Sequence, residues 1–127
     1  MRRFLLAVFA LLAMFGAAAA FSSFAPYDKA KFDQAVQSGA PVIAHVHATW
    51  CSTCRRQEEL MNDMLKDARF AKVQAMRVDY DTDKDFQKAH NVNSRATILV
   101  FKGGKEVARV VFDTDPARIK SAVESVL

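Results

Sequence analysis

The feature that most constrains this chain is Trp50-Cys51-Ser52-Thr53-Cys54, which contains its only two cysteines. It follows an apolar run at residues 41–48 and precedes a segment whose apolar side chains recur with helical spacing. Two intervening residues let both sulfurs meet across the first turn of a helix, whose N-terminal field favours thiolate over thiol. The pattern therefore predicts a thiol–disulfide exchange centre at a strand–helix junction. A purely structural disulfide is the weaker alternative, because so short a loop removes little entropy from the unfolded chain.

The first twenty residues have the layout of a secretory signal. Met1-Arg2-Arg3 is positively charged, residues 4–15 carry no charge, and Ala17-Ala18-Ala19-Ala20 supplies small residues for cleavage after Ala20. Removal would leave 127 − 20 = 107 residues, one small domain at residues 21–127. We therefore expect a periplasmic or otherwise exported protein. The alternative is an uncleaved segment that anchors the protein to a membrane.

The charge balance excludes one class of partner. The chain has 18 Lys and Arg against 14 Asp and Glu, a formal net charge of +4, and two of the basic residues fall in the predicted signal. The excess that remains is too small to indicate nucleic-acid binding. We expect a monomer that carries no cofactor.

The rest of the chain alternates between helical and extended patterns. An α/β fold is predicted, with a four-stranded mixed sheet and helices on both faces. Residues 21–26 are apolar and irregular, or form a short edge strand. The expected helices are 27–38, 54–66, 83–90 and one starting at Pro116, and the expected strands are 42–48, 73–79, 97–101 and 107–112.

This order of elements, Trp50-Cys51-x-x-Cys54, the segment 97–104 and the terminal helix together resemble the thioredoxin family over essentially the whole predicted mature chain. The resemblance implies a protein disulfide oxidoreductase in which Cys51 attacks, Cys54 resolves the mixed disulfide and Trp50 shelters the site. Its partners would be proteins with disulfides or thiols, and a membrane thiol donor would restore the pair. Within that activity we favour a reductase.

The chain departs from the family pattern at positions near the cysteines. The family's cis-proline falls at Ala96, so the Arg95–Ala96 peptide is either trans or a strained cis bond, and both residues are expected to contact substrate. The family's buried acid falls at His45, which is expected to accept the proton of Cys54. A glycine that borders the substrate groove falls at Phe112, whose side chain would narrow that groove.

Two histidines leave a second function open. His45 and His47 are two residues apart on a predicted strand, so they face the same side as the cysteines. Two histidines and two cysteines could bind zinc or copper, which would make the chain a metal-binding or metal-delivery module. The simpler interpretation is that both histidines pack in the core, and the oxidoreductase remains the favoured function.

Overall fold

The computed structural model describes residues 23–127. The expected signal segment at residues 1–20 lies outside the described residues, so its cleavage and its alternative role as an anchor stay predictions. Among residues 23–127, no helix has the length and apolar character needed to cross a membrane.

A mixed sheet forms the centre of the molecule, with its strands in the order β1-β3-β2-β4-β5. β1, β3 and β2 run parallel, whereas β4 is antiparallel to both β2 and β5. The predicted α/β fold is confirmed, but the predicted number of four strands is wrong. The short N-terminal segment adds a fifth strand by pairing Phe24 with Ala75 at the sheet edge. The strands are β1 (Phe24–Pro26), β2 (Val42–His47), β3 (Gln74–Asp79), β4 (Thr97–Lys102) and β5 (Lys105–Val111).

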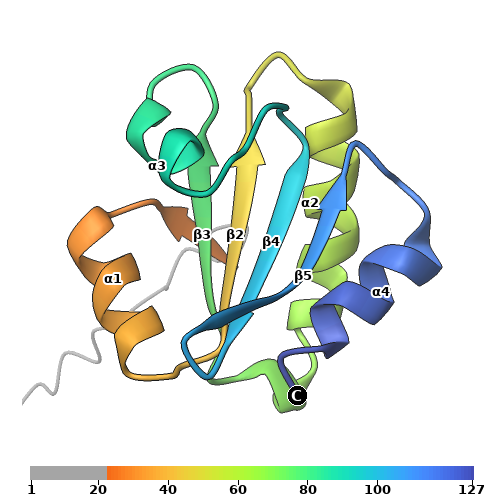
Figure 1. Cartoon of the computed structure of the whole chain (residues 1–127). Helices are drawn as coiled ribbons and strands as arrows, with labels where there is room; N and C mark the ends of the chain where they lie inside the picture. The colour runs from red at the N-terminus through yellow and green to blue at the C-terminus, as the bar shows by residue number, and fades with distance from the viewer. Residues whose placement is uncertain (1–22) are drawn as a thin grey trace, which may run out of the picture.

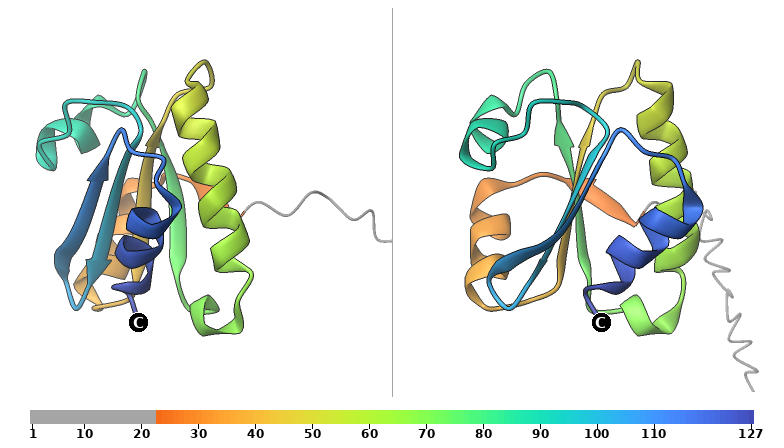
Figure 2. Two further views of the ribbon diagram at one scale, coloured as in Figure 1. Left: turned by 90° about the vertical axis from the view of Figure 1, so that its right-hand side faces the viewer. Right: turned by 45° about the vertical axis from the view of Figure 1, so that its right-hand side comes forward.

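Helices cover both faces of this sheet, as the two further views also show (Figures 1 and 2). One face carries α1 (Lys29–Gln37) and α3 (Lys84–Ala89), and the other carries α2 (Ser52–Leu65) and α4 (Pro116–Glu124). A short 3₁₀ turn at Ala68–Phe70 follows α2. Each helix lies close to its predicted range, because its apolar stripe matches the helical period.

The central strand β2 is buried along its whole length. Its alternation places Val42, Ala44 and Val46 in the cluster beneath α1 and α3. Ile43 packs in the opposite cluster, beneath α2 and α4. His45 follows the same alternation as Ile43, so a polar ring lies in the layer between the sheet and α2.

A tight hairpin joins β4 to β5. Gly103 and Gly104 have φ values of 61° and 80°, the left-handed conformation that a two-residue hairpin turn requires at both positions. The predicted hairpin is therefore confirmed; after a register shift between Val100 and Phe101, its pairing brings the end of β5 beside the start of β4.

Candidate active site

Cys51 and Cys54 form a disulfide at the N-terminus of α2, with their Cα atoms 5.3 Å apart. Cys51 is the N-cap residue, and its Sγ accepts the backbone N–H of Cys54 at 3.1 Å. An N–H group at a helix start normally lacks a partner, so it stabilises negative charge on this sulfur. Cys51 is 3% exposed and Cys54 is fully buried, so only Cys51 has surface that a partner could reach.

The disulfide lies in a small apolar cluster with Ala48 and Ala96, against which Tyr80 packs. Trp50 stands outside this cluster and is 56% exposed. Its indole Nε1–H donates to Asp81 Oδ2 at 2.8 Å, and its ring meets Tyr80 edge-on. Trp50 therefore lies at the surface beside the disulfide, where these contacts fix its ring, and it is not a core aromatic.

The loop before β4 reaches the disulfide through Ala96. The Arg95–Ala96 peptide bond is trans, and Ala96 has a φ of 57°. Proline holds φ near −65°, so the family's proline could not occupy this backbone conformation. Ala96 is fully buried: its N–H donates to the Val46 carbonyl and its carbonyl accepts the N–H of Phe112, both at 2.8 Å. Arg95, the residue before it, is half-buried.

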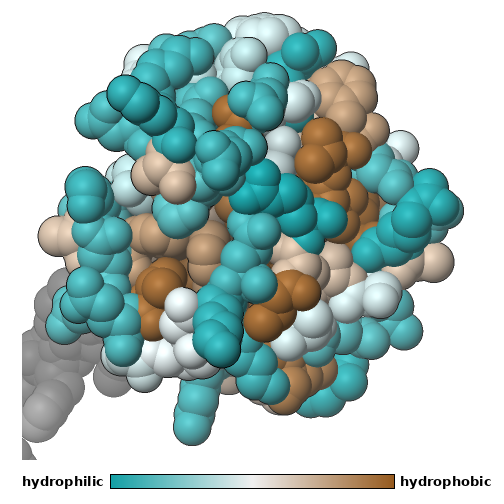
Figure 3. Space-filling view, in the orientation of Figure 1, coloured by the Kyte–Doolittle hydropathy of each residue, from teal (hydrophilic) through white to brown (hydrophobic). Residues whose placement is uncertain are grey.

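Arg95 lies between two aromatic rings. Its guanidinium carbon is 4.7 Å from the ring centroid of Trp50 and 5.0 Å from that of Phe112. Phe112 takes the left-handed conformation that suits the family's glycine, with a φ of 52°, and remains 47% exposed. Figure 3 shows apolar surface over the end of β5, where Val111 and Phe112 are exposed.

A buried amide joins α2 to the loops around the site. The Gln57 side chain donates to the Ala96 carbonyl at 2.9 Å and to the Asp113 carbonyl at 3.0 Å. These two bonds fix which end of the amide is the oxygen, so Oε1 must accept the third bond, from His45 Nε2 at 2.9 Å. His45 therefore donates from Nε2 to Gln57 and not to a sulfur.

Glu58 forms a charged cluster on the same face of α2. Its carboxylate pairs with the Arg77 guanidinium and lies 3.7 Å from His45 Nδ1 and 3.6 Å from His47 Nε2. Burial raises the pKa of Glu58, but the neighbouring His45 and Arg77 outweigh it and lower this pKa to about 2. Burial, with the charge of His45, lowers the pKa of His47. The family's buried acid on the strand is thus replaced here by an acid on the helix.

The expectation that both histidines face α2 is confirmed, since each approaches Glu58. The structure does not support the alternative metal site. Among residues 23–127, no group of three or more His, Cys, Asp or Glu side chains is arranged to hold a metal ion.

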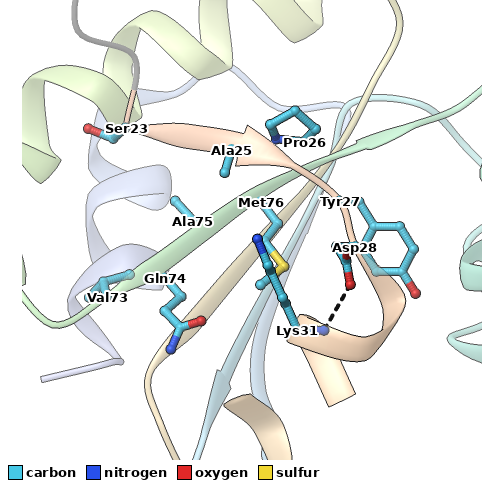
Figure 4. A pocket seen from close by; sticks show the side chains of 10 residues that line it. All are labelled: Ser23, Ala25, Pro26, Tyr27, Asp28, Lys31, Val73, Gln74, Ala75 and Met76. Carbon is cyan, nitrogen blue, oxygen red and sulfur yellow. Dashed lines mark hydrogen bonds between the residues drawn. The ribbon is translucent and has the colours of Figure 1, made fainter. Parts of the chain in front are cut away.

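Two hollows elsewhere lack the cysteines. One, of about 500 Å³, lies at the sheet edge among β1, the start of α1 and the first half of β3, as the positions of Pro26, Lys31 and Met76 show (Figure 4). The other, of about 360 Å³, opens beside α2 and is lined in part by His47, Glu58 and Arg77. Neither is lined by a cysteine, and the disulfide remains the candidate active site.

Sequence reasoning did not identify Gln57, Glu58 or Arg77. The signal was present, because Cys54, Gln57, Glu58 and Met61 recur at the spacing of one helix face. Two polar residues on a buried face indicate an internal network, since buried polar groups require partners.

The comparisons with known proteins agree with this geometry. The thioredoxin family model matches residues 23–125. The chain belongs to the thioredoxin family. It is 35% identical to thioredoxin-2 of Saccharomyces cerevisiae over 99 residues, which covers 75% of this chain and 89% of the yeast protein. Thioredoxin-1 of the same yeast is 31% identical over 93 residues, 73% of this chain and 87% of that protein.

Solved structures give the same result. Trxlp from Edwardsiella tarda superposes with a TM-score of 0.73 at 32% identity, covering 77% of this chain and 95% of that one. Oxidised thioredoxin O2 from Arabidopsis thaliana gives a TM-score of 0.70 at 27% identity, covering 83% and 95%. As a thioredoxin with a Cys51–Cys54 pair, the chain is a thiol–disulfide oxidoreductase.

The charged cluster predicts an acid-dependent stability. The pKa of Glu58 falls from 4.5 to about 2 on folding, so its contribution is complete above the unfolded pKa and is lost as the pH falls between these values. Glu58→Gln should lower the free energy of unfolding at pH 7 by about 2 kcal/mol, and the difference from wild type should vanish near pH 2. Urea unfolding of wild type and variant across this pH range measures the difference in the free energy of unfolding. Glu59→Gln, on the exposed side of α2, is the control, and a pH-independent difference would contradict the assignment.

Proposed function

We propose that this thioredoxin is exported and reduces disulfides in partner proteins through Cys51 and Cys54. The observation that carries the disulfide exchange is the Cys51–Cys54 disulfide at the start of α2, in which Cys51 caps the helix and Cys54 is buried. A metal-binding function has no comparable support in the described part of the chain.

The two sulfurs differ in their roles. Cys51 attacks a partner's disulfide as a thiolate, which breaks that bond, forms a mixed disulfide and releases the first partner thiolate. Cys54 then attacks the Cys51 sulfur and releases the second. Two electrons pass to the partner, and the protons lost by Cys51 and Cys54 are taken up by the released thiolates. The helix N-terminus assists the first step by stabilising charge on Cys51.

Three further residues bear on how a partner binds. Trp50 offers an exposed ring beside Cys51, and the half-buried Arg95 of the loop before β4 stacks on that ring. Ala96 contributes by shaping that loop, because its own backbone groups are bonded within the chain. We place partner contact on Trp50 and Arg95, with Ala96 as their support.

These roles predict asymmetric trapping. Cys54→Ser should accumulate mixed disulfides with partner proteins, whereas Cys51→Ser should not, because only the former keeps the attacking sulfur and loses the resolving one. Non-reducing electrophoresis of cells that express each variant, with thiols blocked by acid and alkylation, measures this. The double variant is the control. Equal trapping by both single variants, or trapping by Cys51→Ser alone, would overturn the assignment.

His45 acts on the site through Gln57, which makes it a positioning residue. Replacement by glutamine keeps a donor near Nε2 but removes the imidazole ring. His45→Gln should slow the exchange by about tenfold to a hundredfold at neutral pH.

Stopped-flow reduction of a model disulfide by the folded variant tests this prediction. His47→Gln is the matched control, since His47 lies on the same strand face and also approaches Glu58, whereas the Gln57 amide oxygen bonds to His45. An unchanged exchange rate together with a lowered melting temperature would show that His45 only supports the fold.

The proposal that the protein is exported rests on the sequence pattern of the first twenty residues. The proposal that it acts as a reductase rests on its membership of the thioredoxin family. An exported thioredoxin has no access to cytosolic reductants, so we propose that a membrane thiol donor keeps Cys51 and Cys54 in the dithiol form. The protein would then be found reduced in the cell, whereas an oxidant would be found as the disulfide.

One mass measurement tests export and direction together. Cells that express the full chain are quenched with acid, alkylated and fractionated, and the intact protein is weighed. We expect an N-terminus near Phe21, which reports cleavage, and two alkyl groups, which report the dithiol. Retained Met1 on membrane-bound protein would support the anchor instead. A cleaved protein without alkyl groups would contradict the reductase direction but leave export intact.

A further inference from the structure

An arginine without a counter-charge stands beside the disulfide. Arg95 is stacked between the rings of Trp50 and Phe112, which come from the loop after β2 and from the residue that follows β5. A guanidinium group carries its N–H bonds in its own plane, so stacking on ring faces leaves these edges free to bind an anion. The rings thus hold the group flat without using its N–H donors.

In the part of the chain that the structure describes, no acidic side chain pairs with those donors. Within residues 23–127, Arg95 forms no ion pair, and its buried Nε–H has no hydrogen-bond partner. The acidic groups next to the stack are already engaged: Asp81 accepts from Trp50, and Asp113 accepts from Arg118. A buried donor without a partner is unfavourable, and a guanidinium that no carboxylate pairs with can still bind an anion through its remaining N–H groups.

Arg95 lies close to the disulfide that reacts with partner proteins. Ala96, the next residue, contacts Cys51 and Cys54, and Trp50 directly precedes Cys51. The loop before β4 and the start of α2 lie at the same end of the sheet (Figure 1). A partner whose disulfide reaches Cys51 must therefore place its neighbouring residues against the Arg95 edge.

We propose that the stack of Trp50, Arg95 and Phe112 selects partner proteins that carry Asp or Glu beside the reactive disulfide. The partner's carboxylate would accept two parallel N–H bonds from the guanidinium of Arg95, the geometry in which arginine binds carboxylates best. The inference rests on the proposed function, since it concerns which disulfides the Cys51–Cys54 pair reduces. The electron balance is that of the exchange already described: the dithiol becomes a disulfide, and the partner's disulfide becomes two thiols.

Two synthetic peptides with the same internal disulfide test the proposal, one with Glu and one with Gln next to a cysteine. The full chain is reduced with dithiothreitol, desalted and mixed with each peptide, and second-order rate constants are measured. The wild type should reduce the Glu peptide about tenfold faster, and salt should weaken this preference. Arg95→Gln should reduce both peptides at similar rates, and Arg95→Lys should keep a smaller preference because a point charge replaces the planar fork.

Arg69→Gln is the matched control, because it removes the same charge from the 3₁₀ turn, away from the site, and should keep the full preference. Melting curves establish that each variant is folded. Equal wild-type rates on the two peptides, or a preference that survives in folded Arg95→Gln, would overturn the inference alone. Failure to reduce either peptide would overturn the proposed function and the inference with it. Reduction of oxidised glutathione as fast as the Glu peptide would show that the site serves small carboxylates and not protein segments.

Discussion

The side-chain amide of Gln57 holds together the segments that make up the site. It joins α2 to the strand that carries His45, to the Ala96 carbonyl before β4 and to the Asp113 carbonyl after β5. Each bond is buried or partly buried, where a lost partner is more unfavourable than at the surface. Without this amide, the loops bearing Arg95 and Phe112 would have no common support from the helix that carries the cysteines.

The charged cluster next to this amide takes its acid from a different element than the family pattern does. Glu58 supplies the acid from α2, and Arg77 supplies the cation from β3. His45 and His47 approach the same carboxylate from β2. A carboxylate cannot remain charged in such a layer unless opposite charge or hydrogen bonds compensate for burial, so these residues depend on one another.

Two left-handed residues determine the shape of the surface above the disulfide. Ala96 and Phe112 both have positive φ, and the N–H of Phe112 donates to the Ala96 carbonyl. Side chains other than glycine are mildly strained in this conformation, so the surrounding bonds must hold it. The result is a trans peptide at Arg95–Ala96 and an arginine stacked between rings, where the family pattern has proline and glycine.

The sequence alone determined the α/β fold, the redox pair at a strand–helix junction and the side of β2 that His45 and His47 face. These follow from local periodicity and from the spacing of Cys51 and Cys54. β1 could not be assigned, because three residues are too few to show alternation and its pairing with β3 is a long-range contact. Gln57 and Glu58 gave a periodic signal, but their partners lie on other strands and loops. Only the tertiary structure decided that Arg95 meets Trp50 and Phe112, because chain folding alone brings together residues so distant in sequence.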